Sequence, residues 1–188
     1  MIQLIKAINS FAKLSNYETQ TIEKSFIYEK FNKRDLILTA QQRVNYIYFL
    51  QSGLVKGFTN DDGKVIVKHL VEPFHFFTDF DNFIINEISS ESYQAITDIE
   101  VYKINQEAFY NLQQESNSFQ IAINKILQAS LSCKMERLND FQTLNAKERY
   151  LKLLKNSPIL LQEVPVADLS SYLGIEPSSL SRIRKQAF

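Results

Sequence analysis

The sequence predicts an α+β chain in which an N-terminal antiparallel β-roll is followed by a long helix and a C-terminal helix-turn-helix. Residues 25–104 alternate short β-branched and aromatic runs with polar turn residues, as strands joined by tight turns do. Residues 119–140 contain no Gly or Pro and space their apolar side chains as a helix does. Residues 164–188 have the length and turn chemistry of two short helices.

The composition fits one compact domain or two small ones. Hydrophobic residues make up 45% of the 188, including 14 Phe and 9 Tyr, so the chain can bury a core. No apolar run approaches the roughly 18 residues of a membrane span, and residues 1–14 resemble an amphipathic helix rather than a secretory signal. Cys133 is the only cysteine, which excludes an internal disulfide and a cysteine-held cluster. We therefore expect a cytoplasmic protein without a membrane partner.

The strands of the roll are expected at residues 25–31, 36–38, 46–50, 54–58, 65–70 and 99–104. Asp62 and Gly63 lie between two of these runs, and an Asp-Gly pair in that position is a strong hairpin signal. Residues 99–104 alternate apolar and polar side chains, which indicates a half-buried strand. Short strands at near-regular spacing favour a small antiparallel barrel or roll.

Residues 106–112 predict a short helix, and residues 119–140 predict a long one with two apolar stripes. The first stripe has the alternating spacing of three and four residues of a coiled-coil seam, and its members are Phe119, Ala122, Ile126, Ala129 and Cys133. The neighbouring stripe is Ile123, Leu127, Leu131 and Leu138. We expect the first stripe to form a homodimer interface, because its small residues suit close helix packing. The alternative is one broad face buried within a single monomer.

The C-terminal segment predicts three further helices. Asn145 and Glu148 form a capping box that starts a helix over 145–156. Pro165 suits a first helical turn, and Gly174 can adopt the positive φ of a sharp turn between two helices. The second helix of this pair is expected to present hydroxyls and cations outward: Ser178, Ser179, Ser181, Arg182 and Lys185.

An outward face of this kind suits the major groove of double-stranded DNA. Hydroxyls near a helix N-terminus can bond phosphate oxygens, and Arg182 can reach a guanine edge with two hydrogen bonds. Residues 1–141 carry 14 Lys/Arg against 17 Asp/Glu, whereas residues 142–188 carry 7 against 4, which is the sign a DNA module needs. The alternative is an ordinary helical hairpin with a solvated basic face.

Three motifs resemble Crp/Fnr-type regulators, especially the short versions typical of Bacteroidetes. Residues 172–184 (YLGIEPSSLSRIR) resemble their helix-turn-helix, residues 48–56 (YFLQSGLVK) a strand and turn of their β-roll, and residues 146–150 (AKERY) the preceding helix. The resemblance implies a cyclic-nucleotide-binding-like sensor roll at 1–115, a dimerisation helix at 116–141 and a DNA-binding domain at 142–188.

The resemblance also implies which residues contact DNA. Pro177, Ser178 and Arg182 occupy positions where many members place Arg, Glu and Arg, so only Arg182 is retained. The familiar half-site sequence is therefore not expected. Ser179 is expected to contact a phosphate.

Relatives that bind cyclic nucleotides use a cassette with a Gly-Glu pair and, about ten residues later, an Arg-Ser or Arg-Thr pair. Here Thr78 and Asp79 stand at the first pair, and Ser89 and Ser90 at the second. Residues 69–98 contain no Lys or Arg and several carboxylates, which would repel a phosphate. We expect no ordinary binding of cAMP or cGMP.

Other ligands are left open, and an unidentified small-molecule effector is one of them. An apolar pocket is one interpretation of five aromatic residues, and plain core packing is the commoner one: Phe74, Phe76, Phe77, Phe80 and Phe83. His75 and Asp79 could share a helical face near His69, but ordinary histidines are far commoner than metal ligands. We expect no metal, haem or iron–sulfur cofactor.

No catalytic motif is present: the four glycines form no phosphate loop, and no nucleophile elbow or metalloprotease pattern occurs. We therefore expect a DNA-binding transcription regulator rather than an enzyme. The alternative is a ligand- or partner-sensing β-roll module without effective DNA binding. Its motivation is the weak basicity and the missing Arg-Glu pair.

Overall fold

The computed structural model describes residues 1–187. Phe188, the last residue of the predicted 142–188 domain, lies outside the described residues. The helices are α1 (Ile2–Asn9), α2 (Asn16–Ser25), α3 (Phe80–Ile85), α4 (Gln106–Glu115), α5 (Asn117–Thr143), α6 (Ala146–Asn156), α7 (Pro158–Glu163), α8 (Val166–Leu173) and α9 (Pro177–Ala187). The strands are β1 (Ile27–Phe31), β2 (Leu36–Leu38), β3 (Tyr46–Ser52), β4 (Val55–Asp61), β5 (Lys64–Val71), β6 (Phe76–Phe77), β7 (Ser92–Ala95) and β8 (Ile99–Asn105).

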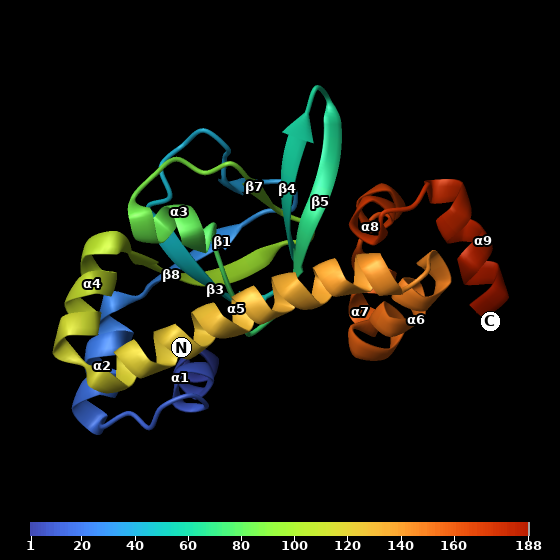
Figure 1. Ribbon diagram of the computed structural model, residues 1–188. Coiled ribbons are helices and arrows are strands. Elements are labelled where there is room, and N and C mark those ends of the chain that lie inside the picture. The colour runs from blue at the N-terminus through green and yellow to red at the C-terminus, as the bar shows by residue number, and fades with distance from the viewer. Residues whose placement is uncertain (188) are drawn as a thin grey trace.

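The strands form two four-stranded antiparallel sheets, in the orders β1-β8-β3-β6 and β2-β7-β4-β5. The predicted α+β class with an antiparallel roll and a long helix is confirmed (Figure 1). The predicted hairpin is β4–β5, and its turn residues Asp62 and Gly63 have φ values of 47° and 87°. Positive φ at both positions matches the right-handed twist of the two strands.

Helix α5 runs along the whole molecule, from α1, α2 and α4 at one end to α6–α9 at the other (Figure 1). Its first half packs into the core of the roll, because Phe119, Ala122 and Ile126 are buried there. The predicted dimer stripe through these three residues is therefore wrong, since they already face their own protomer. Among residues 1–187, no helix combines the length and hydropathy that crossing a membrane requires.

The C-terminal helices have their own hydrophobic cluster, which includes Tyr150, Leu169 and Leu180. Two residues of the roll, Leu54 and Ile96, are buried in the same cluster. Asn145 and Glu148 form the predicted capping box of α6, whereas α7 begins at a proline and was not expected from the sequence. The C-terminal helices thus pack on the roll as well as on each other.

Gly174 ends α8 in the left-handed region, with φ of 65°, as predicted. A Cβ at this position would lie 2.6 Å from Cε1 of Phe141. Gly63 also has a positive φ, but a Cβ there would meet nothing within 4 Å. The two glycines therefore separate the cost of backbone conformation from the cost of a clash.

We expect Gly174→Ala to lower the free energy of unfolding by about 2–4 kcal/mol, because a left-handed Ala costs roughly 1–2 kcal/mol and the contact with Phe141 adds to it. Gly63→Ala should lose only the roughly 1–2 kcal/mol that a left-handed Ala costs, because no side chain lies near that position. Urea denaturation of both variants measures the difference. Equal losses for the two variants would show that Phe141 does not restrict this turn.

Candidate nucleic-acid interface and ligand cleft

Helix α9 buries one face and exposes the other. Leu180 and Ile183 are buried in the C-terminal cluster. The opposite face carries the five residues that the sequence predicts for DNA contact, all exposed except the half-buried Ser179: Ser178, Ser179, Ser181, Arg182 and Lys185. The structure thus brings the five predicted residues onto one helix at one end of the molecule (Figure 1). Their contact with DNA stays a prediction.

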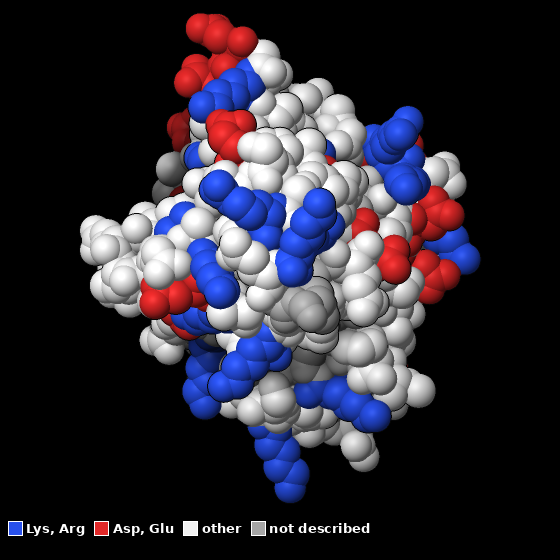
Figure 2. Space-filling view, turned by 90° about the vertical axis from the view of Figure 1, so that its right-hand side faces the viewer, with Lys and Arg blue, Asp and Glu red and all other residues white. Residues whose placement is uncertain are grey.

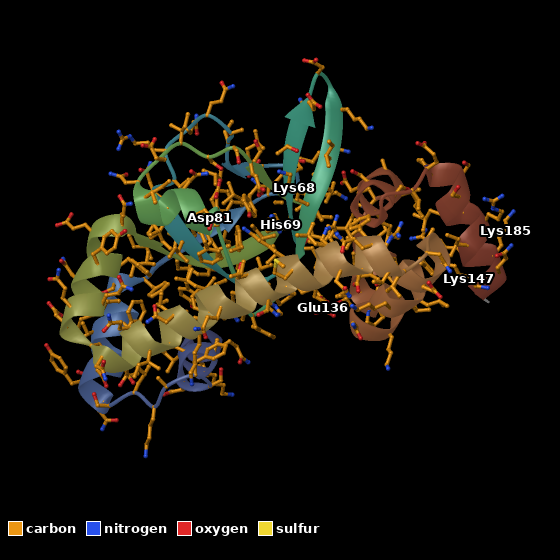
Figure 3. The ribbon with its side chains drawn as sticks, in the orientation of Figure 1. Lys68, His69, Asp81, Glu136, Lys147 and Lys185 are labelled. Atoms are coloured by element: carbon orange, nitrogen blue, oxygen red, sulfur yellow. The ribbon has the colours of Figure 1, made fainter. Side chains whose placement is uncertain are left out.

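The α9 end of the molecule is rich in cations. Figure 2 looks onto this end and shows Lys and Arg spread over its centre and lower part, with Asp and Glu mainly near its margins. Lys147, in the first turn of α6, lies at the same end as Lys185 (Figure 3). Sequence analysis missed Lys147, although its place at the start of the preceding helix was visible. Arg184 is different, because its Nη2 donates to the Leu161 carbonyl at 2.9 Å.

Helix α5 exposes a different apolar stripe from the predicted one. Its members Ile121, Leu131, Met135 and Leu138 are 41%, 61%, 58% and 58% exposed. With Asn124 and Gln128 between them, they follow the alternating spacing of three and four residues of a coiled-coil seam. These six residues, the α5 seam, are the candidate pairing surface. Ala129 and Cys133 of the predicted stripe line a cleft, which Leu138 at the end of the α5 seam also borders.

The predicted phosphate cassette is closed by its own side chains. Asp79 caps the N-terminus of α3 and accepts a hydrogen bond from Ser89 Oγ at 2.7 Å and another from Asn82 Nδ2 at 2.8 Å. Thr78, Asp79 and Ser89 are buried, whereas Ser90 is exposed. Thr78 Oγ1 donates to the Tyr46 carbonyl at 2.8 Å. A carboxylate thus caps α3 with its hydrogen-bonding partners already in place.

A second carboxylate lies beside the cassette. Glu91 is 3.1 Å from Nε2 of His69 and 3.4 Å from Nζ of Lys68. Burial disfavours its charged form, but the contacts with His69 and Lys68 outweigh burial and lower the pKa of Glu91 to about 2. Glu91 is therefore ionised at neutral pH and already pairs with the nearby cation Lys68.

The alternative of a metal site at His69, His75 and Asp79 depended on a helical face shared by His75 and Asp79, and no such face exists. The chain between His75 and Asp79 contains strand β6 and no helix. His69 pairs with Glu91, and Asp79 caps α3. Within residues 1–187, no group of three or more His, Cys, Asp or Glu side chains is placed to hold a metal ion.

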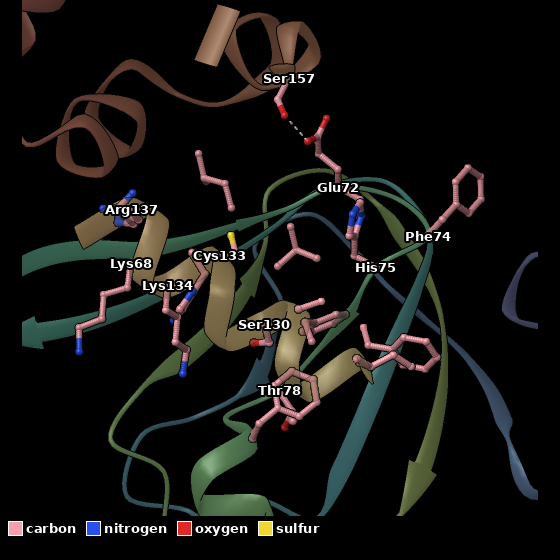
Figure 4. A pocket seen from close by; sticks show the side chains of 18 of the residues that line it. Lys68, Glu72, Phe74, His75, Thr78, Ser130, Cys133, Lys134, Arg137 and Ser157 are labelled. Carbon is pink, nitrogen blue, oxygen red and sulfur yellow. Dashed lines mark hydrogen bonds between the residues drawn. The ribbon is translucent and has the colours of Figure 1, made fainter. Parts of the chain in front are cut away.

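A cleft of about 1080 Å³ lies between the roll, α1, α5 and the C-terminal helices (Figure 4). Four of the five predicted pocket aromatics line it: Phe74, Phe76, Phe77 and Phe80. The fifth, Phe83, is instead a fully buried core residue packed edge-on against Phe109. Ala129 and Cys133 of the predicted dimer stripe line the cleft from α5, together with Ser130. These small side chains leave space beside the roll.

Residues 28–116 match the family model described as the cyclic nucleotide-binding domain. The match covers the strands of the roll, α3, α4 and the predicted phosphate cassette. A search of curated proteins finds no match to this chain.

Solved structures show the same fold over nearly the whole chain. FixK2 from Bradyrhizobium japonicum has a TM-score of 0.74 and 15% identity, over 86% of this chain and 83% of that one. CLP from Xanthomonas campestris, a c-di-GMP responsive global regulator, has a TM-score of 0.72 and 17% identity, over 92% and 91%. A transcriptional regulator of the Crp/Fnr family from Eubacterium rectale has a TM-score of 0.71 and 14% identity, over 92% of this chain and 83% of that one. The chain therefore shares its fold with regulators of this type.

Proposed function

We propose that the protein is a DNA-binding transcription regulator of the short Crp/Fnr type rather than an enzyme. The observation that carries the proposal is α9, which is anchored by Leu180 and Ile183 and exposes Ser178, Ser181 and Arg182 at a basic end of the molecule. Hydroxyls at its N-terminus suit phosphate oxygens, and a guanidinium farther along suits a guanine edge. A cytoplasmic location follows from this role.

The regulator would act as a homodimer through the α5 seam. Two parallel copies of α5 would bury Leu131, Met135 and Leu138 of each protomer against the other. Because α9 lies at the C-terminal end of α5, a parallel pair places both recognition helices at the same end. They would then enter successive major grooves, about one helical turn apart. In this scheme, residues 1–115 form the sensor, 116–141 the dimerisation helix and 142–188 the DNA-binding domain.

Any effector would differ from an ordinary cyclic nucleotide, because Asp79 and Ser89 satisfy each other where a phosphate would bind. The cleft offers aromatic walls and the small side chains of Ala129 and Ser130 instead. Sites of this composition hold mostly apolar ligands with a few polar anchors.

We expect cAMP or cGMP at about 1 mM to leave the melting temperature of the protein unchanged, since a ligand that does not bind the folded state cannot stabilise it. Differential scanning fluorimetry measures this, with a cyclic-nucleotide-binding regulator as the positive control. A saturable rise of several degrees would contradict the closed cassette.

The cleft also favours a second candidate function, a sensing module without effective DNA binding. A cleft of about 1080 Å³ between the roll and the C-terminal helices suits a ligand or a partner segment. The weak overall basicity, with equal numbers of acidic and basic residues, fits this alternative.

Selection from random-sequence duplex DNA by the full-length protein separates the two functions. We expect enrichment of a two-fold symmetric consensus with two half-sites. Selection at low salt, where phosphate contacts are strongest, gives weak binders their best chance. If no sequence is enriched even there, the regulator proposal fails and the sensing module stands.

A further inference from the structure

Two arginines from different helices hold the carbonyl end of α8. Arg137 on α5 donates from Nη2 to the Tyr172 carbonyl at 2.8 Å. Arg149 on α6 donates from Nε and Nη2 to the Leu173 carbonyl at 3.1 and 3.0 Å. Both acceptors belong to the last two residues of α8, directly before the turn that leads to α9.

These carbonyls need outside donors, because the last carbonyls of a helix have no intrahelical partner. The N–H groups of Gly174 and Ile175 turn back to Ser170 and Ser171 instead. The C-terminal end of a helix also carries a partial negative charge, which favours cations. Each guanidinium thus supplies both the missing hydrogen bonds and the complementary charge.

Phe141 fills the space between the two arginines. Its ring centroid is 4.9 Å from Cζ of Arg137 and 4.7 Å from Cζ of Arg149. Cζ of Arg137 is also 3.9 Å from the ring centroid of Tyr172. Gly174 lies so close to the Phe141 ring that a Cβ would clash with it. Phe141 therefore contacts both guanidinium groups and the turn between α8 and α9.

Arg137 also joins this contact to the roll. The same Nη2 donates to the Val67 carbonyl of β5 at 3.3 Å. Ser171 of α8 bonds the edge of β5 as well, since its Oγ accepts from Val67 N at 2.9 Å and donates to the Val65 carbonyl at 3.1 Å. Arg137 of α5 thus forms hydrogen bonds to both β5 and α8, and it lies at the edge of the cleft (Figure 4).

We propose that Arg137 and Arg149 are positioning residues that fix the direction of α9 relative to α5. The inference rests on the proposed function, because a fixed direction matters when two recognition helices must meet two half-sites. A rigid joint sets the distance between these helices in the dimer. The protein then tolerates only one half-site spacing.

The test compares operators whose half-sites are moved apart or together by one and two base pairs. The variant is Arg137→Ala. The control is Lys134→Ala, which removes a cation one turn earlier whose Nζ forms an ion pair with the exposed Asp81 at 3.4 Å. We expect wild type and control to discriminate against wrong spacings by at least about 10-fold. Arg137→Ala should discriminate by less than about 3-fold. A merely destabilised variant would lose affinity equally at every spacing, and Arg137→Ala with wild-type discrimination overturns the inference.

Arg137→Lys covers the case in which the alanine variant does not fold. Lysine keeps the charge but not the planar fork of donors, so we expect the same loss of discrimination. Wild-type discrimination in this variant overturns the role given to the guanidinium.

A second measurement does not depend on DNA. Spin labels at Gln114→Cys in α4 and Gln186→Cys in α9, in a Cys133→Ser background of the full-length protein, report the distance between α4 at one end of the molecule and α9 at the other. Diluting labelled with unlabelled protein keeps the distances within one protomer. We expect the wild-type protein to give a narrow distribution of the distance between the two spin labels, and the width of this distribution to increase at least about 2-fold with Arg137→Ala. An unchanged width overturns the inference even if no operator is found, whereas failure of the wild type to select DNA overturns only the proposed function.

Discussion

Replacing Arg182 by alanine is expected to lower affinity for the selected operator by at least about 30-fold and affinity for random DNA by only a few fold. A bidentate contact between arginine and guanine discriminates by roughly 1–3 kcal/mol, and a dimer makes it twice. The combined loss of about 2–6 kcal/mol corresponds to roughly 30-fold to 10⁴-fold. Because Arg182 is exposed on α9, its removal should leave fold and dimer intact. Fluorescence anisotropy at one fixed salt concentration measures both affinities.

Lys147→Ala is the matched control, since it removes an exposed cation from the same end of the molecule. A phosphate contact carries no sequence information, so this variant should weaken binding to the operator and to random DNA alike. The slope of the logarithm of the binding constant against the logarithm of the salt concentration should become shallower by about 0.9 for each lost phosphate contact, or about 1.8 for the dimer. If Arg182→Ala also weakened both DNAs equally, Arg182 would be a phosphate contact and the proposed base recognition would be wrong.

Replacing Leu131 and Leu138 together by glutamate is expected to convert the dimer into a folded monomer and to lower operator affinity by at least about 100-fold. Both side chains are more than half exposed, so the protomer loses little core. In a parallel pair, the substitutions would place like charges against each other and remove apolar burial. Separated protomers also lose the gain from binding two linked half-sites.

Sedimentation equilibrium measures the mass of this double variant, and far-ultraviolet circular dichroism checks its fold. Leu151→Glu serves as the control, because it changes a 40% exposed leucine on α6, outside the α5 seam. The control should remain dimeric and bind the operator as wild type does. A double variant that remains dimeric would show that protomers pair through another surface.

The elements with local signals could be predicted from the sequence. The β4–β5 hairpin follows from Asp62 and Gly63, whose positive φ values the turn requires. The start of α6 follows from the capping box of Asn145 and Glu148. The outward face of α9 follows from helical spacing, because fixing Leu180 and Ile183 inward leaves Arg182 outside.

The choice between the two stripes of α5 could not be made from spacing. Both stripes are apolar, and only the position of the roll decides that Phe119 and Ile126 are buried while Leu131 and Leu138 are exposed. The first half of α5 packs into the roll, whereas the second half runs past it. The same periodic stripe is therefore buried in the core at its start and lines the cleft at its end. The local sequence pattern is the same in both parts and does not show this change.

Long-range pairs were equally hidden. Arg137 meets Tyr172, 35 residues later, and a single arginine in a helix gives no sign of such a partner. The sequence predicted part of the cassette, because it placed the carboxylate of Asp79 where it would repel a phosphate. The direct hydrogen bond from Ser89 that closes the site needed the structure.

Hydroxyl-radical footprinting of the selected operator tests the central claim most directly, because it shows where a bound dimer lies on DNA. The account predicts two protected stretches related by two-fold symmetry, with centres about 10–10.5 base pairs apart. Both should disappear with Arg182→Ala at a protein concentration that saturates the site with wild type. A footprint without two-fold symmetry, or one that Arg182→Ala leaves unchanged, would contradict recognition by paired α9 helices.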